Sequence, residues 1–175
     1  MKTYEISEAK VYVGTYAKYN DGSIYGAWID LDSDMDSFFE KCRELHKDES
    51  DPEFMFQDWE NIPECFISEC SISETFFDIY DDLLQLENEG ILDAFFSYCD
   101  YICGGCIDSE IVSKFRDAYE GEFDSEVDFA YYFVDEGLFG EVDEKIYCYL
   151  DFNKIARDIF MDYTFVDGYV FNAVG

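Results

Sequence analysis

Three cysteines in the second half of the chain have a spacing that can hold a metal cluster. Cys99, Cys103 and Cys106 stand in C-x3-C-x2-C order, which in radical enzymes holds an iron–sulfur cluster with one open iron site. Those enzymes use a large α/β barrel, whereas this chain has 175 residues and its cysteines fall at a predicted helix end. Cys103 and Cys106 also lack the preceding strand of a thioredoxin-like redox pair. We therefore predict buried thiols at a helix end and no cofactor.

The single histidine and a row of aspartates are the next candidates for chemistry. His46 has no nucleophile motif near it, and its place in the last turn of a predicted helix favours a partner of the helix dipole. The alternating aspartates from Asp30 to Asp36 suggest a calcium loop, but its sixth position is Met35 and its twelfth is Lys41. The sequence thus predicts neither catalytic residues nor a metal site, and a protein that is not an enzyme.

The charge of the chain is its most unusual property. It has 42 acidic and 11 basic residues, a formal net charge of -31, and 20% aromatic residues. Between Lys47 and Lys114 there are 18 acids and no base, together with eleven aromatic residues. Disordered acidic segments are poor in aromatics, so this composition predicts a folded core under an acidic surface. Such a surface repels nucleic acid and anionic membranes, which leaves basic proteins as the expected partners.

The location of the protein is indicated by its N-terminus, its hydropathy and its cysteines. The N-terminal segment MKTYEISEAK has no apolar stretch of a signal peptide, and no apolar run approaches the roughly 20 residues of a membrane span. Seven cysteines without a secretory context favour reduced thiols packed as small hydrophobic side chains. We expect a cytoplasmic protein without disulfides.

Residues 1–62 have the pattern of a small α+β domain. Alternating apolar residues over 11–15, a turn at 20–22 and a second run over 24–31 predict a hairpin. Asp34 or Ser33 can cap a helix that runs to about His46, and residues 53–60 alternate as a third strand.

Residues 63–107 read as an acidic helical middle domain. Ser71 and Glu74 have the spacing of a capping box. A helical stripe follows, formed by Ile72, Phe76, Ile79, Tyr80, Leu83 and Leu86. A second helix is predicted from Ile91 to about Cys103.

Residues 108–175 read as a second α+β domain. Asp108 can cap a helix, residues 120–123 form a short strand, and residues 125–136 and those after Asp151 form two more helices. A hairpin over 163–166 and 169–173 closes the chain. The predicted fold class is therefore α+β, an elongated chain of three small domains with net charges of -9, -10 and -12.

The charge of the chain is comparable with that of DNA. Duplex DNA carries one charge per roughly 1.7 Å of axis, so 31 charges match about 53 Å, and the 62 of a dimer match about 105 Å or roughly 31 base pairs. Acids three or four apart on a helix lie about 5–6 Å from each other, close enough to imitate a row of phosphates. These numbers favour DNA mimicry. An acidic adaptor or inhibitor of another basic protein, and an enzyme that uses the cysteine triad, remain the alternatives.

Several segments resemble one known family, the ArdA antirestriction proteins of plasmids and conjugative transposons. The segments are KYNDGSIYGAW from Lys18, MFQDWE from Met55, DFAYYFVDEGLFGEVDEKI from Asp128, YLDFNKIARDIF from Tyr149 and FVDGYVF from Phe165. They stand in family order in the first and last predicted domains, whereas the middle domain matches chiefly in its acidic helical character.

The resemblance implies a curved three-domain homodimer that imitates bent B-form DNA. Such a protein occupies the DNA-binding groove of type I restriction-modification enzymes and so protects incoming mobile DNA, without binding nucleic acid or membranes itself. Dimerisation is attributed to the C-terminal domain, where Phe129, Tyr132 and Phe133 are the expected interface residues. The expected mimic surface consists of Asp78, Asp81, Asp82, Glu87, Glu89, Asp93, Asp100, Asp108, Glu110, Asp117, Glu120, Glu122, Asp124 and Glu126.

Overall fold

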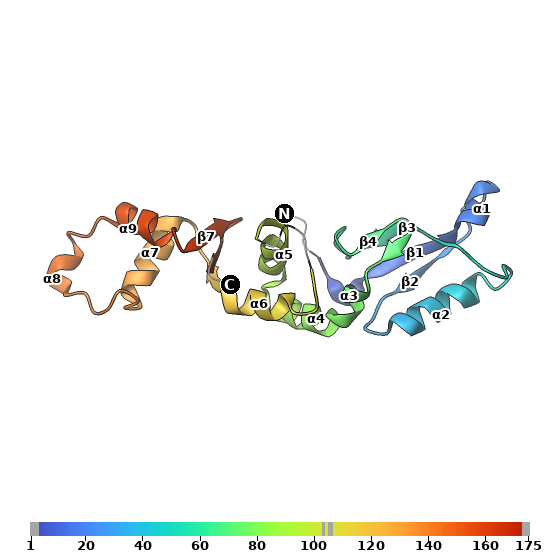
Figure 1. Cartoon of the computed structure of the whole chain (residues 1–175), viewed down its shortest axis with the longest axis horizontal. Helices are drawn as coiled ribbons and strands as arrows, with labels where there is room; N and C mark the ends of the chain where they lie inside the picture. The colour runs from blue at the N-terminus through green and yellow to red at the C-terminus, as the bar shows by residue number, and fades with distance from the viewer. Residues whose placement is uncertain (1–3, 103, 105–106, 173–175) are drawn as a thin grey trace. The chain divides into compact units, whose positions relative to one another are not determined.

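A computed structural model describes residues 4–102, 104 and 107–172 of the chain (Figure 1). The described residues have the predicted α+β class, with helices around small antiparallel sheets. The chain forms two compact units, which are described separately: unit 1 comprises residues 1–93 and 107–109, and unit 2 comprises residues 94–106 and 110–175. The division into three domains stays a prediction.

Unit 1 is built on a three-stranded antiparallel sheet in the order β2-β1-β3. The central strand β1 (Lys10–Thr15) pairs with β2 (Ala27–Asp30) and with β3 (Phe54–Glu60). Val11 and Val13 on β1 are fully buried because every second residue of a strand points to the same face. The predicted hairpin and third strand are therefore confirmed.

The connection between β1 and β2 differs from the simple turn that the sequence predicted. A short helix, α1 (Tyr16–Asn20), follows β1, and β2 begins at Ala27 rather than at Ile24. The Tyr12 hydroxyl donates hydrogen bonds to the carbonyls of Ile24 and Gly26, which holds this segment outside the strand ladder. A side chain at Gly26 would place its Cβ 2.4 Å from the Val13 carbonyl oxygen, so only glycine fits there.

One face of this sheet is covered by α2 (Met35–Leu45), which runs beside β2 in Figure 1. Asp34 caps the helix by accepting a hydrogen bond from the Ser37 amide at 2.9 Å, as predicted. Phe38 and Cys42 lie on its buried face. Burial raises the pKa of the Cys42 thiol to about 12, so this thiol stays protonated and packs as a small hydrophobic side chain.

The remainder of unit 1 begins with a feature that the sequence did not predict. The short strands β4 (Ile67–Ser68) and β5 (Ser71–Ile72) form a two-stranded ladder, in which the Ser68 and Ser71 hydroxyls lie 2.7 Å apart. Ser71 is therefore a strand residue, and the predicted capping box is wrong. The following helix instead begins after Ser73.

The predicted helical stripe is confirmed from Phe76 onward and is divided between two helices, whereas Ile72 lies in β5 and not in a helix. The two helices are α3 (Glu74–Asp78) and α4 (Tyr80–Glu89), which meet at Ile79. The buried residues on them are Phe76, Phe77, Ile79, Tyr80, Leu83 and Leu86. The end of α4 packs beside the short 3-10 helix η1 (Ile6–Glu8), and Gly90 ends α4 in the left-handed conformation that favours glycine. The boundary between the units falls in α5 (Leu92–Tyr101).

Unit 2 contains a second three-stranded antiparallel sheet, in the order β6-β8-β7. Strands β7 (Tyr163–Val166) and β8 (Tyr169–Asn172) form the predicted closing hairpin, and Asp167 and Gly168 at its turn have positive φ angles of 52° and 92°. Helix α6 (Ile111–Ala118) leads into β6 (Tyr119–Glu122), which pairs with β8. The residue before α6 is Glu110, so the helix begins later than the predicted cap at Asp108 implies.

Two predicted helices complete the core of unit 2. Ser125 and Asp151 cap α7 (Glu126–Asp135) and α9 (Phe152–Ile159), each by accepting a hydrogen bond from an amide of the first turn. Between them lies the short helix α8 (Glu144–Tyr147), which the sequence did not predict. The buried core residues are Phe129, Ala130, Val134, Phe152, Ala156, Ile159 and Val170. Among the described residues, none of the helices is long and apolar enough to cross a membrane.

Candidate acidic binding surface

None of the acidic side chains of the protein is fully buried. All 42 acids are among the described residues, and all but four are exposed. The four half-buried acids are Glu49, Glu87, Asp93 and Glu120. Unit 1 contains 25 acids and 6 bases, and unit 2 contains 17 acids and 5 bases. Each unit is therefore strongly anionic by itself.

Within unit 1, the helices α3 and α4 present a row of carboxylates. Asp78, Asp81, Asp82 and Glu89 are exposed, while Leu83 and the other apolar side chains of α4 point into the core. Asp78 ends α3 and Asp81 and Asp82 begin α4, so these three acids flank the junction at Ile79. The buried apolar side chains hold the backbone of these helices in place. The exposed carboxylates therefore keep their positions on the surface.

Glu87 has a structural contact that separates it from the other predicted surface acids of unit 1. Its carboxylate accepts hydrogen bonds from the Ser7 amide at 3.1 Å and from the Ser7 hydroxyl at 3.2 Å. This contact attaches α4 to η1, and it leaves Glu87 half-buried. Asp93 is also half-buried. Both acids therefore offer less of their charge to a partner than Asp81 or Asp82 does.

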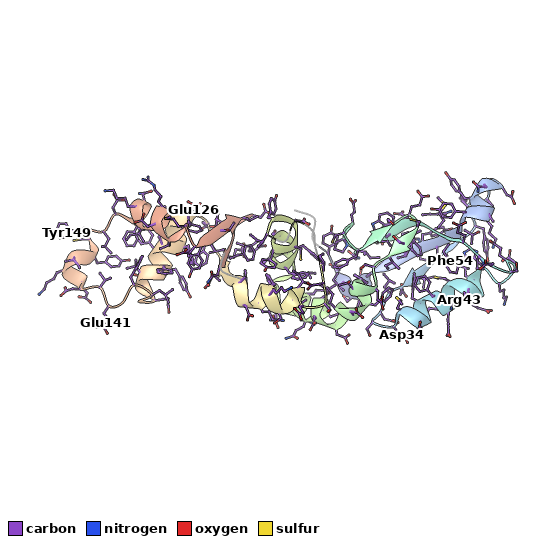
Figure 2. The ribbon with its side chains drawn as sticks, in the orientation of Figure 1. Asp34, Arg43, Phe54, Glu126, Glu141 and Tyr149 are labelled. Atoms are coloured by element: carbon purple, nitrogen blue, oxygen red, sulfur yellow. The ribbon has the colours of Figure 1, made fainter. Side chains whose placement is uncertain are left out.

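Within unit 2, acids line β6 and the start of α7. Figure 2 labels Glu126, which lies at the first turn of α7. Glu122, Asp124 and Glu126 are exposed at every second position. The pairing of β6 with β8 shifts between Tyr119 and Gly121, which marks a bulge. Gly121 has a φ of 140° there, a conformation that side-chain-bearing residues rarely adopt.

The predicted surface set as a whole is mostly accessible. Eleven of its fourteen members are exposed: Asp78, Asp81, Asp82, Glu89, Asp100, Asp108, Glu110, Asp117, Glu122, Asp124 and Glu126. Their accessibility is compatible with the predicted role, which itself stays a prediction.

Glu120 at the bulge differs from the other acids because burial raises its pKa above the ordinary carboxyl value. A raised pKa means that the folded state favours the protonated form, so the stabilisation is present below the unfolded pKa and is lost as the pH rises through the folded pKa. We therefore expect Glu120→Gln to stabilise the protein at about pH 7 and to have little effect at about pH 3, where the carboxyl group is protonated in both the folded and the unfolded state. Urea unfolding at the two pH values measures this difference.

The control for Glu120→Gln is Glu122→Gln, which removes the same charge from an exposed neighbour on the same strand. Glu122→Gln reduces the repulsion among the acidic residues but does not change a buried carboxyl group. It should therefore stabilise the protein at neutral pH by less than Glu120→Gln does. Equal effects of the two variants would show that burial of Glu120 has no energetic consequence.

Six lysines of the described residues form ion pairs with carboxylates, which limits the positive charge that the surface displays. The ion pairs are Lys10–Glu60, Lys18–Asp48, Lys18–Glu49, Lys41–Asp32, Lys47–Glu44, Lys114–Glu110 and Lys154–Asp151. Exposed pairs of this kind contribute only about 0–1 kcal/mol each to stability. Their consequence here is electrostatic, because each lysine lies within a locally acidic surface.

His46 forms a buried bridge rather than the predicted partner of a helix dipole. Its Nδ1 lies 3.0 Å from the Lys18 Nζ and its Nε2 lies 3.1 Å from the Val13 carbonyl oxygen. Because the lysine ammonium can only donate, Nδ1 accepts and Nε2 carries the proton that is donated to Val13. His46 is fully buried, and its two ring contacts link α1, β1 and the end of α2.

The cysteines divide into two groups. Cys42 and Cys99 are buried, as the sequence predicted, whereas Cys65, Cys70 and Cys148 are exposed. Cys103 and Cys106 of the predicted triad lie outside the described residues. Within the described residues, no three His, Cys, Asp or Glu side chains are placed to hold a metal ion together.

The three predicted interface aromatics occupy different environments in unit 2. Phe129 is fully buried in the core, Phe133 is half-buried against that core, and Tyr132 is 40% exposed. Of the three, Tyr132 is thus the side chain most available to a partner.

Sequence reasoning missed four large exposed apolar side chains in the segment that follows α7. They are exposed around α8: Leu138, Phe139, Ile146 and Tyr149. Figure 2 labels Tyr149 and Glu141 on either side of α8. The sequence did contain one sign of this exposed apolar group, namely Leu138 and Phe139 between Gly137 and Gly140. Large apolar residues exposed together in a loop often contact a partner.

Comparison with known proteins gives one match, which is to a protein family. A family model described as antirestriction protein (ArdA) matches residues 11–171. No curated protein matches the chain. The family match runs from β1 into β8, so it includes strands of the three-stranded sheets of both units and the helices α3 and α4 of unit 1. The chain therefore belongs to the ArdA family of antirestriction proteins.

Proposed function

We propose that this antirestriction protein imitates the charge of duplex DNA and occupies the DNA-binding groove of a type I restriction-modification enzyme. Family membership implies an antirestriction function and an interaction with restriction-modification enzymes. The protein would act in the cytoplasm and protect incoming mobile DNA before the enzyme reaches it. The inhibition needs no bond to be made or broken, because occupation of the groove is sufficient.

The observation that supports mimicry best is the separation of charge from core. All 42 acids are exposed or half-buried, while the fully buried large side chains are phenylalanine, isoleucine and leucine. A core of this kind holds the backbone rigid, so the carboxylates keep their spacing when a partner approaches. Lysines and arginines that normally neutralise phosphates would then meet a preformed array of anions.

We further propose that the protein acts as a homodimer, joined through the apolar surface of unit 2. This surface consists of Tyr132, Leu138, Phe139, Ile146 and Tyr149, which are all exposed. Large apolar side chains exposed to water favour burial against a second apolar surface. A second copy offers the same side chains, and two copies would double the number of acidic residues in the assembly.

Competition with DNA tests the proposed function. We expect the purified protein to inhibit cleavage by a type I restriction-modification enzyme, and excess target duplex to displace it from that enzyme. Fluorescence anisotropy of a labelled duplex measures both the displacement of the duplex by the protein and the displacement of the protein by the duplex. Binding to the enzyme that target DNA does not displace would contradict mimicry and would favour an acidic adaptor for basic proteins.

A further inference from the structure

The sheet of unit 1 has one face that α2 does not cover, and this face combines aromatic rings with carboxylates. Lys10 on β1 is opposite Asp30 on β2 and Glu60 on β3. Tyr12 on β1 is opposite Trp28 on β2 and Asp58 on β3. Residues opposite each other in antiparallel strands point to the same face. We call this set of six residues the outer sheet face.

The two aromatic rings of the outer sheet face are held in a fixed arrangement. The rings of Tyr12 and Trp28 meet edge to face, with centroids 5.6 Å apart and an interplanar angle of 75°. The Tyr12 hydroxyl is anchored by the hydrogen bonds to Ile24 and Gly26 described above. Trp28 is nevertheless 40% exposed. The face therefore offers a preformed aromatic surface to a ligand.

The protein itself places a cation on this surface. The Lys10 Nζ lies 5.2 Å from the centroid of the Trp28 ring and 2.7 Å from a Glu60 carboxylate oxygen. The hydrogen bond with Glu60 raises the pKa of Lys10, so the ammonium is retained there. A positive group above an indole ring and beside a carboxylate is a favourable combination. Lys10 therefore marks where a cation from a partner fits.

We propose that the outer sheet face binds an arginine side chain of the restriction-modification enzyme, which takes the place of Lys10 over Trp28. This inference rests on the proposed function, because it names one contact within the same complex. A guanidinium suits the face better than an ammonium does, since it is planar, stacks on aromatic rings and pairs with a carboxylate through two hydrogen bonds. Asp30, Asp58 and Glu60 supply the carboxylates around the rings.

Such a contact would add something that the carboxylates alone do not provide. Pairs of exposed charges weaken as salt rises, because ions screen them. A guanidinium stacked on an indole ring also buries apolar area, which salt does not weaken. The outer sheet face would therefore contribute affinity that persists at salt concentrations at which the remaining acidic surface contributes little.

The test compares Trp28→Ala with Tyr19→Ala in the full-length protein. Tyr19 is an exposed aromatic residue on α1 of the same unit and is 53% exposed. We expect Trp28→Ala to raise the Kd for a purified type I enzyme about tenfold, in the range of a partly desolvated cation–π contact, and Tyr19→Ala to leave it within about twofold. The ratio between the two variants should persist as salt is raised. Trp28→Phe keeps an apolar ring and should give an intermediate loss.

A second comparison removes no aromatic residue and therefore does not depend on the stability of the Trp28 variants. Lys10→Gln vacates the Trp28 ring and frees Glu60, whereas Lys41→Gln removes the same charge from another lysine of unit 1, which pairs with Asp32 at 3.6 Å. We expect Lys10→Gln to bind the enzyme at least about threefold more tightly than Lys41→Gln does.

Two results would overturn the inference while wild-type binding and inhibition remain intact. One is an equal Kd for Trp28→Ala and Tyr19→Ala together with an equal Kd for Lys10→Gln and Lys41→Gln. The other is a loss of dimer mass in Trp28→Ala by sedimentation, which would make the outer sheet face a contact between copies of the chain. A wild-type protein that does not bind the enzyme would overturn the proposed function and this inference with it.

Discussion

Raising the salt concentration from about 50 mM to about 200 mM will weaken the binding of this protein to its target enzyme by between about tenfold and about a thousandfold. The upper figure is what a ligand with roughly six phosphate contacts loses over this range, because bound counterions are released on association. Carboxylates on a folded protein condense fewer counterions than phosphates on a duplex, so we expect the slope per contact to be lower. Isothermal titration calorimetry over a salt series measures it.

The matched control for the salt series is the target duplex itself, titrated against the same enzyme. The logarithm of each Kd should rise linearly with the logarithm of salt concentration, with slopes of the same sign. The combined variant with Asn at Asp78, Asp81 and Asp82 should have a smaller slope than the wild type, since it lacks three exposed charges of one row. A Kd that does not change with salt would contradict an electrostatic mechanism.

Truncation of Phe129 will destabilise the protein by about 3–5 kcal/mol, the usual cost of removing a fully buried phenylalanine. The ring is 0% exposed and lies within 6 Å, centroid to centroid, of the rings of Phe123, Phe133, Phe160 and Tyr163. Phe129→Ala therefore leaves a cavity among four aromatic rings. Urea unfolding followed by circular dichroism measures the loss.

The contrasting variant is Tyr132→Ala, which changes the exposed aromatic residue of the proposed dimer surface. Its side chain is 40% exposed, so we expect a small change in the stability of the monomer and a clear increase in the dimer dissociation constant by analytical ultracentrifugation. The proposal that unit 2 forms the dimer surface would be wrong if Tyr132→Ala remained as dimeric as the wild type. A Phe129→Ala variant of normal stability would contradict its place in the core.

Strand alternation and the helix cap at Asp34 were the local signals that predicted the fold best. Asp34 caps the helix that the sequence assigned to it, because a cap acts through the amides of the next three residues. Alternation likewise located β1, β3 and the closing hairpin. Both signals depend on residues close together in the chain, which is why they can be interpreted without the tertiary structure.

The wrong assignments arose where a side chain or backbone group forms a tertiary contact in place of the local contact that the sequence predicted. Ser71 has the spacing of a helix cap, but it pairs with Ser68 across a short ladder. His46 has the position of a dipole partner, but Val13 and Lys18, which are distant in sequence, bind both ring nitrogens. The N-terminal hairpin contains α1 because hydrogen bonds from Tyr12 hold the segment before β2 away from the ladder.

Composition alone determined that this protein presents an acidic surface on an aromatic core, because ionised carboxylates are too costly to bury and 42 of them have to face water. Composition did not determine how far the carboxylate of each acid is exposed to solvent. Tertiary contacts decided that Glu87 binds Ser7, that Glu120 is half-buried at a bulge and that Phe129 belongs to the core. They also placed Lys10, Tyr12 and Trp28 on one sheet face, since strand register, which no local pattern encodes, selects which residues lie opposite each other.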